Sequence, residues 1–162
     1  MSKESTRKRS FHTANVAVIG LGRFGSALAL ELEASGHQVL GVDFDERVVQ
    51  AHAGQLTHVV SADTTDEETL NELGLSDMDS AVVAIGDNLE ASILTASLLL
   101  QLGIKQVWAK ANSASHGKIL GQLGVHHVIF PEFEMGRRIA HQVSGEALDY
   151  VHIDEDFVMV TV

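Results

Sequence analysis

The chain contains no cysteine and only one proline. Without cysteine it has neither a disulfide framework nor a catalytic thiol, and this composition fits the cytoplasm, which we predict as its compartment. No apolar stretch approaches the roughly 20 residues that cross a membrane, and no apolar signal-peptide core follows the basic N-terminal residues. Basic residues are few overall. The formal net charge of −11 argues against nucleic acid as the main ligand.

Short apolar runs alternate with helical patterns along most of the chain. Strands are expected at 15–19, 38–42, 57–62, 80–85, 106–109 and 127–130, and helices at 23–35, 46–53, 66–73, 89–102, 113–123 and 132–144. Glycine closes four of the helical segments, as a C-cap would: Gly36, Gly74, Gly103 and Gly124. Six strands with short helical connections predict an α/β fold with a Rossmann-like, doubly wound parallel six-stranded sheet in the order 3-2-1-4-5-6.

The segment between the first expected strand and helix has the spacing G-x-G-x-x-G. It consists of Gly20, Leu21, Gly22, Arg23, Phe24 and Gly25. In this pattern the first glycine permits a tight turn, the second lets a pyrophosphate approach the backbone, and the third lets the helix pack closely on the sheet. The helix N-terminus adds N–H groups and a partial positive charge. The segment therefore predicts a nucleotide-binding loop.

Asp43 stands at the end of the second expected strand, 23 residues after Gly20. In a Rossmann fold such a carboxylate accepts hydrogen bonds from the ribose hydroxyls of the adenosine half. The next residue is Phe44 rather than arginine, so a 2′-phosphate meets an anion and NADP is disfavoured. The alternative is a turn or helix-capping role for Asp43, although Asp45 is available for that role.

Other polar residues follow the expected strands on the same edge of the sheet. Arg23 begins the first helix and is expected to neutralise phosphate charge, the alternative being a solvated side chain. Asp63 and Thr64 follow the third strand and are placed to meet adenine or its ribose. Helix capping by Thr64 or Thr65 is the alternative for that segment.

The fourth and fifth strands end in further candidates. The segment after the fourth strand contains Ala84, Ile85, Gly86 and Asn88. Gly86 permits close backbone approach, and Asn88 is placed to bond a ribose or phosphate, although Asp87 or Asn88 equally suits capping of the next helix. Lys110 follows the fifth strand as a second phosphate-neutralising cation, or as a solvated lysine.

Glu132 follows Pro131 at the end of the sixth strand. A carboxylate beside phosphates makes sense mainly with a divalent cation, Mg²⁺ or Ca²⁺, between them; capping of the last helix is the alternative. A histidine-based metal site is not expected. His126 and His127 are adjacent and point to opposite faces of a strand, and no zinc-binding spacing is present.

Five segments together resemble the regulator-of-potassium-conductance N-terminal domain (RCK N, or TrkA-N). They are Val-Ile-Gly-Leu-Gly-Arg-Phe-Gly at 18–25, Val-Asp-Phe-Asp at 42–45, Val-Ala-Ile-Gly-Asp-Asn at 83–88, Trp-Ala-Lys-Ala at 108–111 and Pro-Glu-Phe-Glu-Met-Gly at 131–136. The resemblance covers nearly all of residues 15–150. Domains of this family form the cytosolic gating subunit of bacterial Trk/Ktr potassium transporters.

The resemblance implies a nucleotide-sensing regulatory subunit that binds ATP, ADP or NAD(H). It implies that Asp43 holds the ribose, that Arg23 reaches the phosphates, and that Glu132 lies near a nucleotide-linked divalent cation. It also implies homodimers that assemble into a ring, commonly an octamer, beneath a membrane potassium-translocating subunit. The chain would then be peripheral to the inner face of the membrane, and nucleotide exchange would reshape the ring.

An enzymatic role is not expected. A dehydrogenase needs a substrate domain and a catalytic acid or base near the nicotinamide, and little sequence remains for either. No Ser-His-Asp set is apparent. The alternatives are a fragment of an NAD-dependent oxidoreductase and a nucleotide-binding scaffold for another partner.

The expected organisation has three parts: a disordered basic tail at 1–13, the nucleotide-binding domain at 14–146, and a linker or the start of a missing C-terminal domain at 147–162. Met135, Ile139 and Val143 follow one another at four-residue spacing in the last expected helix. This stripe is expected to pack against a second subunit, with packing inside its own domain as the alternative.

Overall fold

The computed structural model describes residues 13–145, so the strand fragments expected within 147–162 and nearly all of the expected tail lie outside the described residues. The strands are β1 (Asn15–Ile19), β2 (Gln38–Asp43), β3 (His58–Ser61), β4 (Ser80–Val83), β5 (Gln106–Lys110) and β6 (His127–Ile129). The helices are α2 (Arg23–Ala34), α3 (Glu46–His52), α4 (Glu67–Glu72), the 3₁₀ turn η1 (Leu75–Asp77), α5 (Leu89–Gln101), α6 (Ala114–Leu123) and α7 (Pro131–Ser144).

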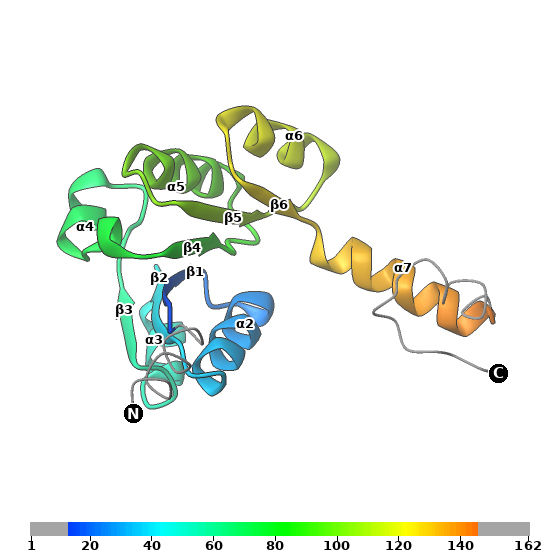
Figure 1. The fold of residues 1–162 in the computed structure, drawn as a ribbon, viewed down its shortest axis with the longest axis horizontal. Helices are drawn as coiled ribbons and strands as arrows, with labels where there is room; N and C mark the ends of the chain where they lie inside the picture. The colour runs from blue at the N-terminus through cyan, green and yellow to red at the C-terminus, as the bar shows by residue number, and fades with distance from the viewer. Residues whose placement is uncertain (1–12, 146–162) are drawn as a thin grey trace, which may run out of the picture. The chain divides into compact units, whose positions relative to one another are not determined.

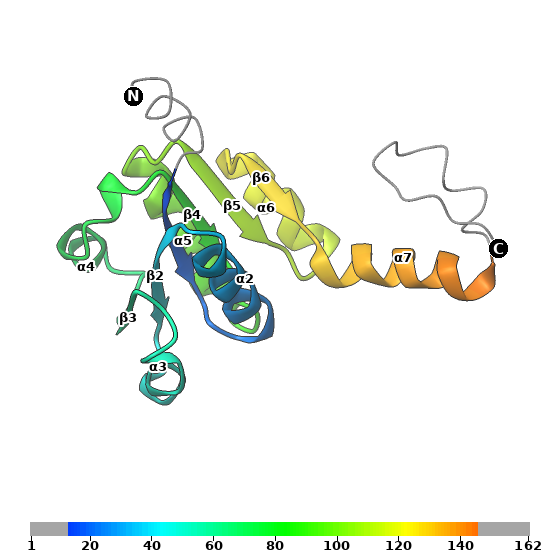
Figure 2. The ribbon, with the colours of Figure 1, turned by 60° about the horizontal axis from the view of Figure 1, so that its bottom comes forward.

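The six strands form one parallel sheet in the order β3-β2-β1-β4-β5-β6, which confirms the predicted fold class and strand order. In the central register Val18 pairs with Gly41 on one side and with Val82 on the other. Helices α2 and α3 lie on one face of the sheet, and α5 and α6 lie on the opposite face (Figures 1 and 2). The strand order reverses between β1 and β4, and in such sheets a ligand crevice lies at that point, beyond the carboxyl ends of the strands.

The core is built from the near-continuous apolar strands that a sheet covered on both faces requires. Ala17, Val18, Val42 and Val83 are fully buried at its centre. On the α2 side, Ala29 of the helix packs with Val16, Val18 and Val82 of the sheet. This packing holds α2 against β1 and β4.

The predicted helix ends are confirmed at the glycines. Gly36, Gly74, Gly103 and Gly124 all have positive φ, the conformation that glycine adopts most readily after a helix. The turn η1 after Gly74 was not predicted. The fourth strand was predicted to run to residue 85, but its pairing ends at Val83; Ala84 makes one more hydrogen bond, to the Ile19 carbonyl at 2.7 Å.

The chain divides into two compact units after Ile129. In its described part, the second unit consists mainly of α7, which starts with Pro131 in the position where a helix tolerates proline. Phe133, Met135, Ile139 and Val143 of this helix are exposed. The domain boundary expected at 146/147 remains a prediction. Within residues 13–145, none of the helices has the length and apolar character to cross a membrane.

Candidate functional site

The three glycines of the loop between β1 and α2 differ in how much space the fold leaves for a side chain. Gly20 has φ +102°, and a Cβ added there would lie 2.7 Å from the Ala84 carbonyl oxygen. A Cβ on Gly25 would lie only 1.7 Å from the Gly20 carbonyl oxygen, whereas a Cβ on Gly22 would meet nothing within 4 Å. The fold therefore requires Gly20 and Gly25, and the backbone at Gly22 faces open space.

Helix α2 begins directly after this open glycine. Its N-cap, Gly22, provides no side-chain hydrogen bond, and its first turn contains no acidic residue. The N–H groups at this end are therefore left for an outside acceptor, and the helix dipole favours an anion there. Arg23 is the first helical residue and is exposed, so it adds a mobile positive charge at the same place.

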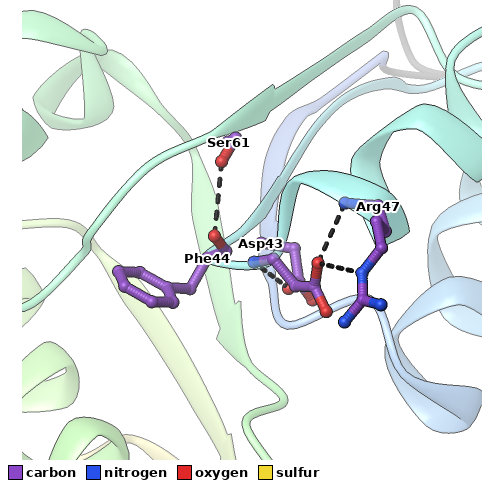
Figure 3. A network of polar contacts seen from close by, with 5 residues as sticks. Asp43, Phe44, Arg47 and Ser61 are labelled. Carbon is purple, nitrogen blue, oxygen red and sulfur yellow. Dashed lines mark hydrogen bonds and ion pairs between the residues drawn. The ribbon is translucent and has the colours of Figure 1, made fainter.

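Asp43 joins the tip of β2 to the glycine loop. Its Oδ2 accepts the Leu21 N–H at 2.8 Å, and its Oδ1 accepts the Asp45 N–H at 2.9 Å. Figure 3 shows Asp43 and its surroundings at the β2 tip. Each carboxylate oxygen has a second lone pair, so both can still accept a hydroxyl. Asp43 thus stabilises its own turn through the Asp45 N–H, as the alternative expected, and its other oxygen holds the glycine loop. Its expected ribose role stays a prediction.

The two residues after Asp43 have separate roles: Asp45 caps the next helix, and Phe44 exposes its ring. Asp45 caps α3, as expected, by accepting the Arg47 N–H at 2.9 Å, and this hydrogen bond is the main reason why the pKa of Asp45 is lowered. Phe44 is 77% exposed, and its ring points away from Asp43 and Arg47 (Figure 3). Its carbonyl accepts the Ser61 hydroxyl at 3.3 Å, so β3 helps to hold the backbone that presents this ring.

Lys110 is not a solvated surface lysine, because it is only 9% exposed. Its Nζ lies 5.9 Å from the centre of the Phe24 ring and would be 3.7 Å from a Cβ on Gly86. A cation at this distance from an aromatic face is attracted by the ring. The first turn of α2, the end of β5 and the loop after β4 therefore come together around one ammonium group.

The segment after β3 makes hydrogen bonds within the protein, and the expected contact of Asp63 and Thr64 with adenine or its ribose stays a prediction. Asp63 folds onto its own turn, where its Oδ1 accepts the N–H of Thr65 at 3.0 Å and the hydroxyl of Thr65 at 2.6 Å; these bonds lower its pKa. Thr64 is buried, and its hydroxyl bonds that of Thr95 on α5 at 2.9 Å. The cap of α4 is Asp66, so the alternative of capping by Thr64 or Thr65 was wrong.

The loop after β4 contains one capping residue and one contact that sequence reasoning missed. Asn88 caps α5 by accepting the Ala91 N–H at 2.9 Å, which was the alternative role considered for it. Ala84 is buried and Ile85 and Gly86 follow the strand end. The Gly86 carbonyl accepts a hydrogen bond from the side chain of Asn112, in the loop between β5 and α6. Asn112 follows a strand end, but no local pattern distinguishes it from an ordinary loop residue.

Glu132 lies in the first turn of α7, in the second unit. Its expected role beside a divalent cation stays a prediction. Among residues 13–145, no group of three or more histidine, aspartate and glutamate side chains is placed to hold a metal ion.

The strand order, the glycine loop and the acid at the β2 tip together define a Rossmann-type α/β domain. The model of the TrkA-N domain family matches residues 16–131. The chain belongs to this family.

Curated relatives agree with this assignment. The chain is 42% identical over 147 residues to the Ktr system potassium uptake protein C of Bacillus subtilis, covering 90% of this chain and 66% of that protein. It is 45% identical over 136 residues to the Ktr system potassium uptake protein A of Vibrio alginolyticus, covering 84% and 62%. The chain thus spans less than two thirds of the length of these relatives.

Solved structures share the fold at low identity. The TrkA-N domain of the inner membrane protein ybaL from Escherichia coli superposes with a TM-score of 0.70 at 20% identity, covering 80% of this chain and 96% of that one. GsuK bound to ADP superposes with a TM-score of 0.64 at 17% identity, covering 73% and 31%.

Proposed function

We propose that this chain is the nucleotide-sensing part of a regulatory subunit of a potassium uptake system, and that it binds ATP, ADP or NAD(H) in the crevice above β1 and β4. Its relatives are named as Ktr system potassium uptake proteins. Structures with the same fold are described with ADP, with NAD and with AMP bound. Binding without chemical conversion of the nucleotide fits these relatives.

The observation that carries the proposal is the hydrogen bond between Asp43 and the N–H of Leu21. It joins the ribose acceptor to the phosphate-binding loop, so both parts of the site are held at a fixed separation before a ligand arrives. Such preorganisation lowers the entropy lost on binding. Lys110 lies beside the loop in a buried position and adds a positively charged group to this part of the proposed site.

The exposed ring of Phe44 completes the adenosine side of the proposed site. The ring follows the ribose acceptor directly in the chain and is anchored through its backbone to Ser61. An apolar, exposed face at this position offers adenine a surface to stack on. Because ATP, ADP and NAD share the adenosine group, this contact contributes equally to all of them.

Calorimetric titration of the purified chain tests the proposal. ATP, ADP, NAD and NADH are each titrated without a metal, with Mg²⁺ and with Ca²⁺. We expect saturable binding of at least one adenine nucleotide and little or no binding of GTP, which serves as the control ligand. If a divalent cation raises the affinity for ATP but not for NAD, the role proposed for Glu132 is supported. Glu132→Gln should then abolish this effect of the cation. Absence of saturable binding for all four nucleotides would refute the proposed function.

We also propose that the chain forms homodimers through α7. The dimers would assemble into a ring, with an octamer as the expected size. The ring would act on a membrane potassium-translocating subunit at the inner face of the membrane. Support comes from the exposed stripe of Met135, Ile139 and Val143, since an apolar stripe of this kind is typical of a contact surface. Sedimentation of Ile139→Asp tests the dimer. Arg137→Asp, on the opposite side of the same helix, is the matched control, and equal sedimentation of both variants with the wild type would contradict the α7 contact.

A further inference from the structure

A buried polar connection links the start of α5 to the loop between β5 and α6. The His116 side chain is 1% exposed. Its Nδ1 accepts the backbone N–H of Asn112 at 3.1 Å, so the neutral ring carries its proton on Nε2. Nε2 then donates to the hydroxyl of Ser92 at 3.0 Å. Ser92 is also fully buried, so both partners of this hydrogen bond are shielded from bulk solvent.

Asn112 extends this connection to the candidate site. While its backbone N–H is held by His116, its side chain donates a hydrogen bond to the Gly86 carbonyl. Asn112 is itself exposed, so core packing does not fix its position. Gly86 lies in the loop after β4, next to the Lys110 ammonium group. The position of the Gly86 carbonyl therefore depends on Asn112, and the position of Asn112 depends on His116.

The imidazole is not needed to start α6. That role belongs to Ser113, whose hydroxyl accepts the His116 N–H at 3.1 Å and caps the helix. An aliphatic side chain would fill the core at position 116, but it would leave the Asn112 N–H without its acceptor. The specific contribution of a histidine here is thus to orient the loop that bonds Gly86.

We propose, on the basis of the function proposed above, that His116 and Asn112 are positioning residues that hold the loop after β4 against the phosphates of the bound nucleotide. The end of β4 lies across the crevice from the glycine loop, where the phosphates of a ligand pass, whereas the base and its ribose lie on the side of β2. Loss of this connection should therefore reduce the affinity for ligands that carry phosphates and leave the affinity for adenosine unchanged.

Parallel calorimetric titrations with ATP and with adenosine test this inference. Asn112→Ala removes the hydrogen bond to the Gly86 carbonyl. It should reduce the affinity for ATP about fivefold, which corresponds to one hydrogen bond, and should leave the affinity for adenosine within about twofold of the wild type. His116→Leu should have the same effect. The double variant should bind ATP no more weakly than either single variant, because both substitutions remove the same support.

Ser113→Ala is the matched control. It removes the helix cap and should lower the melting temperature without changing the ratio of ATP to adenosine affinity. Asn112→Ala keeps the test valid if His116→Leu fails to fold, because the Asn112 side chain is exposed. Unchanged ATP affinity in Asn112→Ala, or an equal loss for ATP and adenosine, would overturn the inference. A wild-type chain that binds neither ligand would overturn the proposed function itself, and this inference with it.

Discussion

The Asp43 carboxylate lies 2.8 Å from the backbone nitrogen of Leu21, and this hydrogen bond connects the end of β2 to the glycine loop that follows β1. A second hydrogen bond, to the Asp45 N–H, holds the other carboxylate oxygen. One side chain therefore stabilises the turn, and in the proposed function it also accepts hydrogen bonds from a ribose. The two roles can be separated by substitution.

Asp43→Ala should reduce both stability and binding. It leaves two backbone N–H groups without their acceptors, which should lower the free energy of unfolding by about 1–3 kcal/mol, and it should weaken ATP and NAD alike. Asp43→Asn keeps one acceptor oxygen but removes the charge, so NADP should gain affinity relative to NAD. Urea unfolding and calorimetry measure the two effects. An NADP-to-NAD affinity ratio that Asp43→Asn leaves unchanged would contradict the ribose role.

Gly22 and Gly25 should respond in opposite ways to alanine. A Cβ at Gly22 meets no atom within 4 Å, so Gly22→Ala should melt within about 2 °C of the wild type, yet lose at least about tenfold in nucleotide affinity because its methyl group occupies the phosphate position. Gly25→Ala drives a methyl group into the Gly20 carbonyl and should cost about 3 kcal/mol or more. Thermal melting with calorimetry compares them. Tight ATP binding by Gly22→Ala would show that the phosphates lie elsewhere.

Arg23→Ala should weaken ATP more than NAD. Arg23 is exposed at the start of α2, where it can reach a terminal phosphate, a group that ATP has and NAD lacks. Loss of a charge-assisted bond of this kind should reduce ATP affinity by about tenfold or more. Arg47→Ala is the control: Arg47 lies in the first turn of α3, and the variant loses its contact with the N-cap residue Asp45. Equal losses of ATP and NAD affinity in Arg23→Ala would refute a terminal-phosphate role.

The pH dependence of stability should reveal the neutral state of His116. Burial lowers the pKa of His116 below its usual 6.5, because the charged ring loses its hydration. Between the folded and unfolded pKa values the unfolded chain binds more protons, so the contribution of His116 to stability is complete above pH 6.5 and declines as the pH falls. Urea unfolding from pH 8 to pH 5 measures this decline.

His116→Leu is the comparison for that experiment and should flatten the decline. The carboxyls of Asp45 and Asp63 do not obscure the result, since their pKa values are lowered from 3.8 and they titrate below this range. An identical pH dependence in wild type and His116→Leu would contradict the assignment.

The sequence predicts the fold well because strand and helix signals are local. Gly36 and Gly124 mark helix ends by a backbone conformation that depends on the residue itself, and Asp45 caps the helix that begins at the next residue. The glycine loop and Asp43 are recognisable for a similar reason: their spacing follows from one β-α-β unit.

The remaining parts of the site depend on partners that are distant in the sequence. Thr64 turns into the core because Thr95, 31 residues later, offers it a buried hydroxyl. Lys110 is buried because Phe24 and Gly86 lie around it. Neither neighbour is predictable from the residues next to Thr64 or Lys110, and the link from His116 through Asn112 to Gly86 was missed for the same reason.

Within residues 13–145 the sheet ends in two short strands, β3 with four residues and β6 with three. Strands of this length offer few unpaired backbone groups for another chain to bond. Edge-to-edge pairing of strands from different molecules is therefore disfavoured at β3 and at β6. The proposed association of copies of this chain would therefore use side chains on helices rather than a continuous ladder of backbone hydrogen bonds.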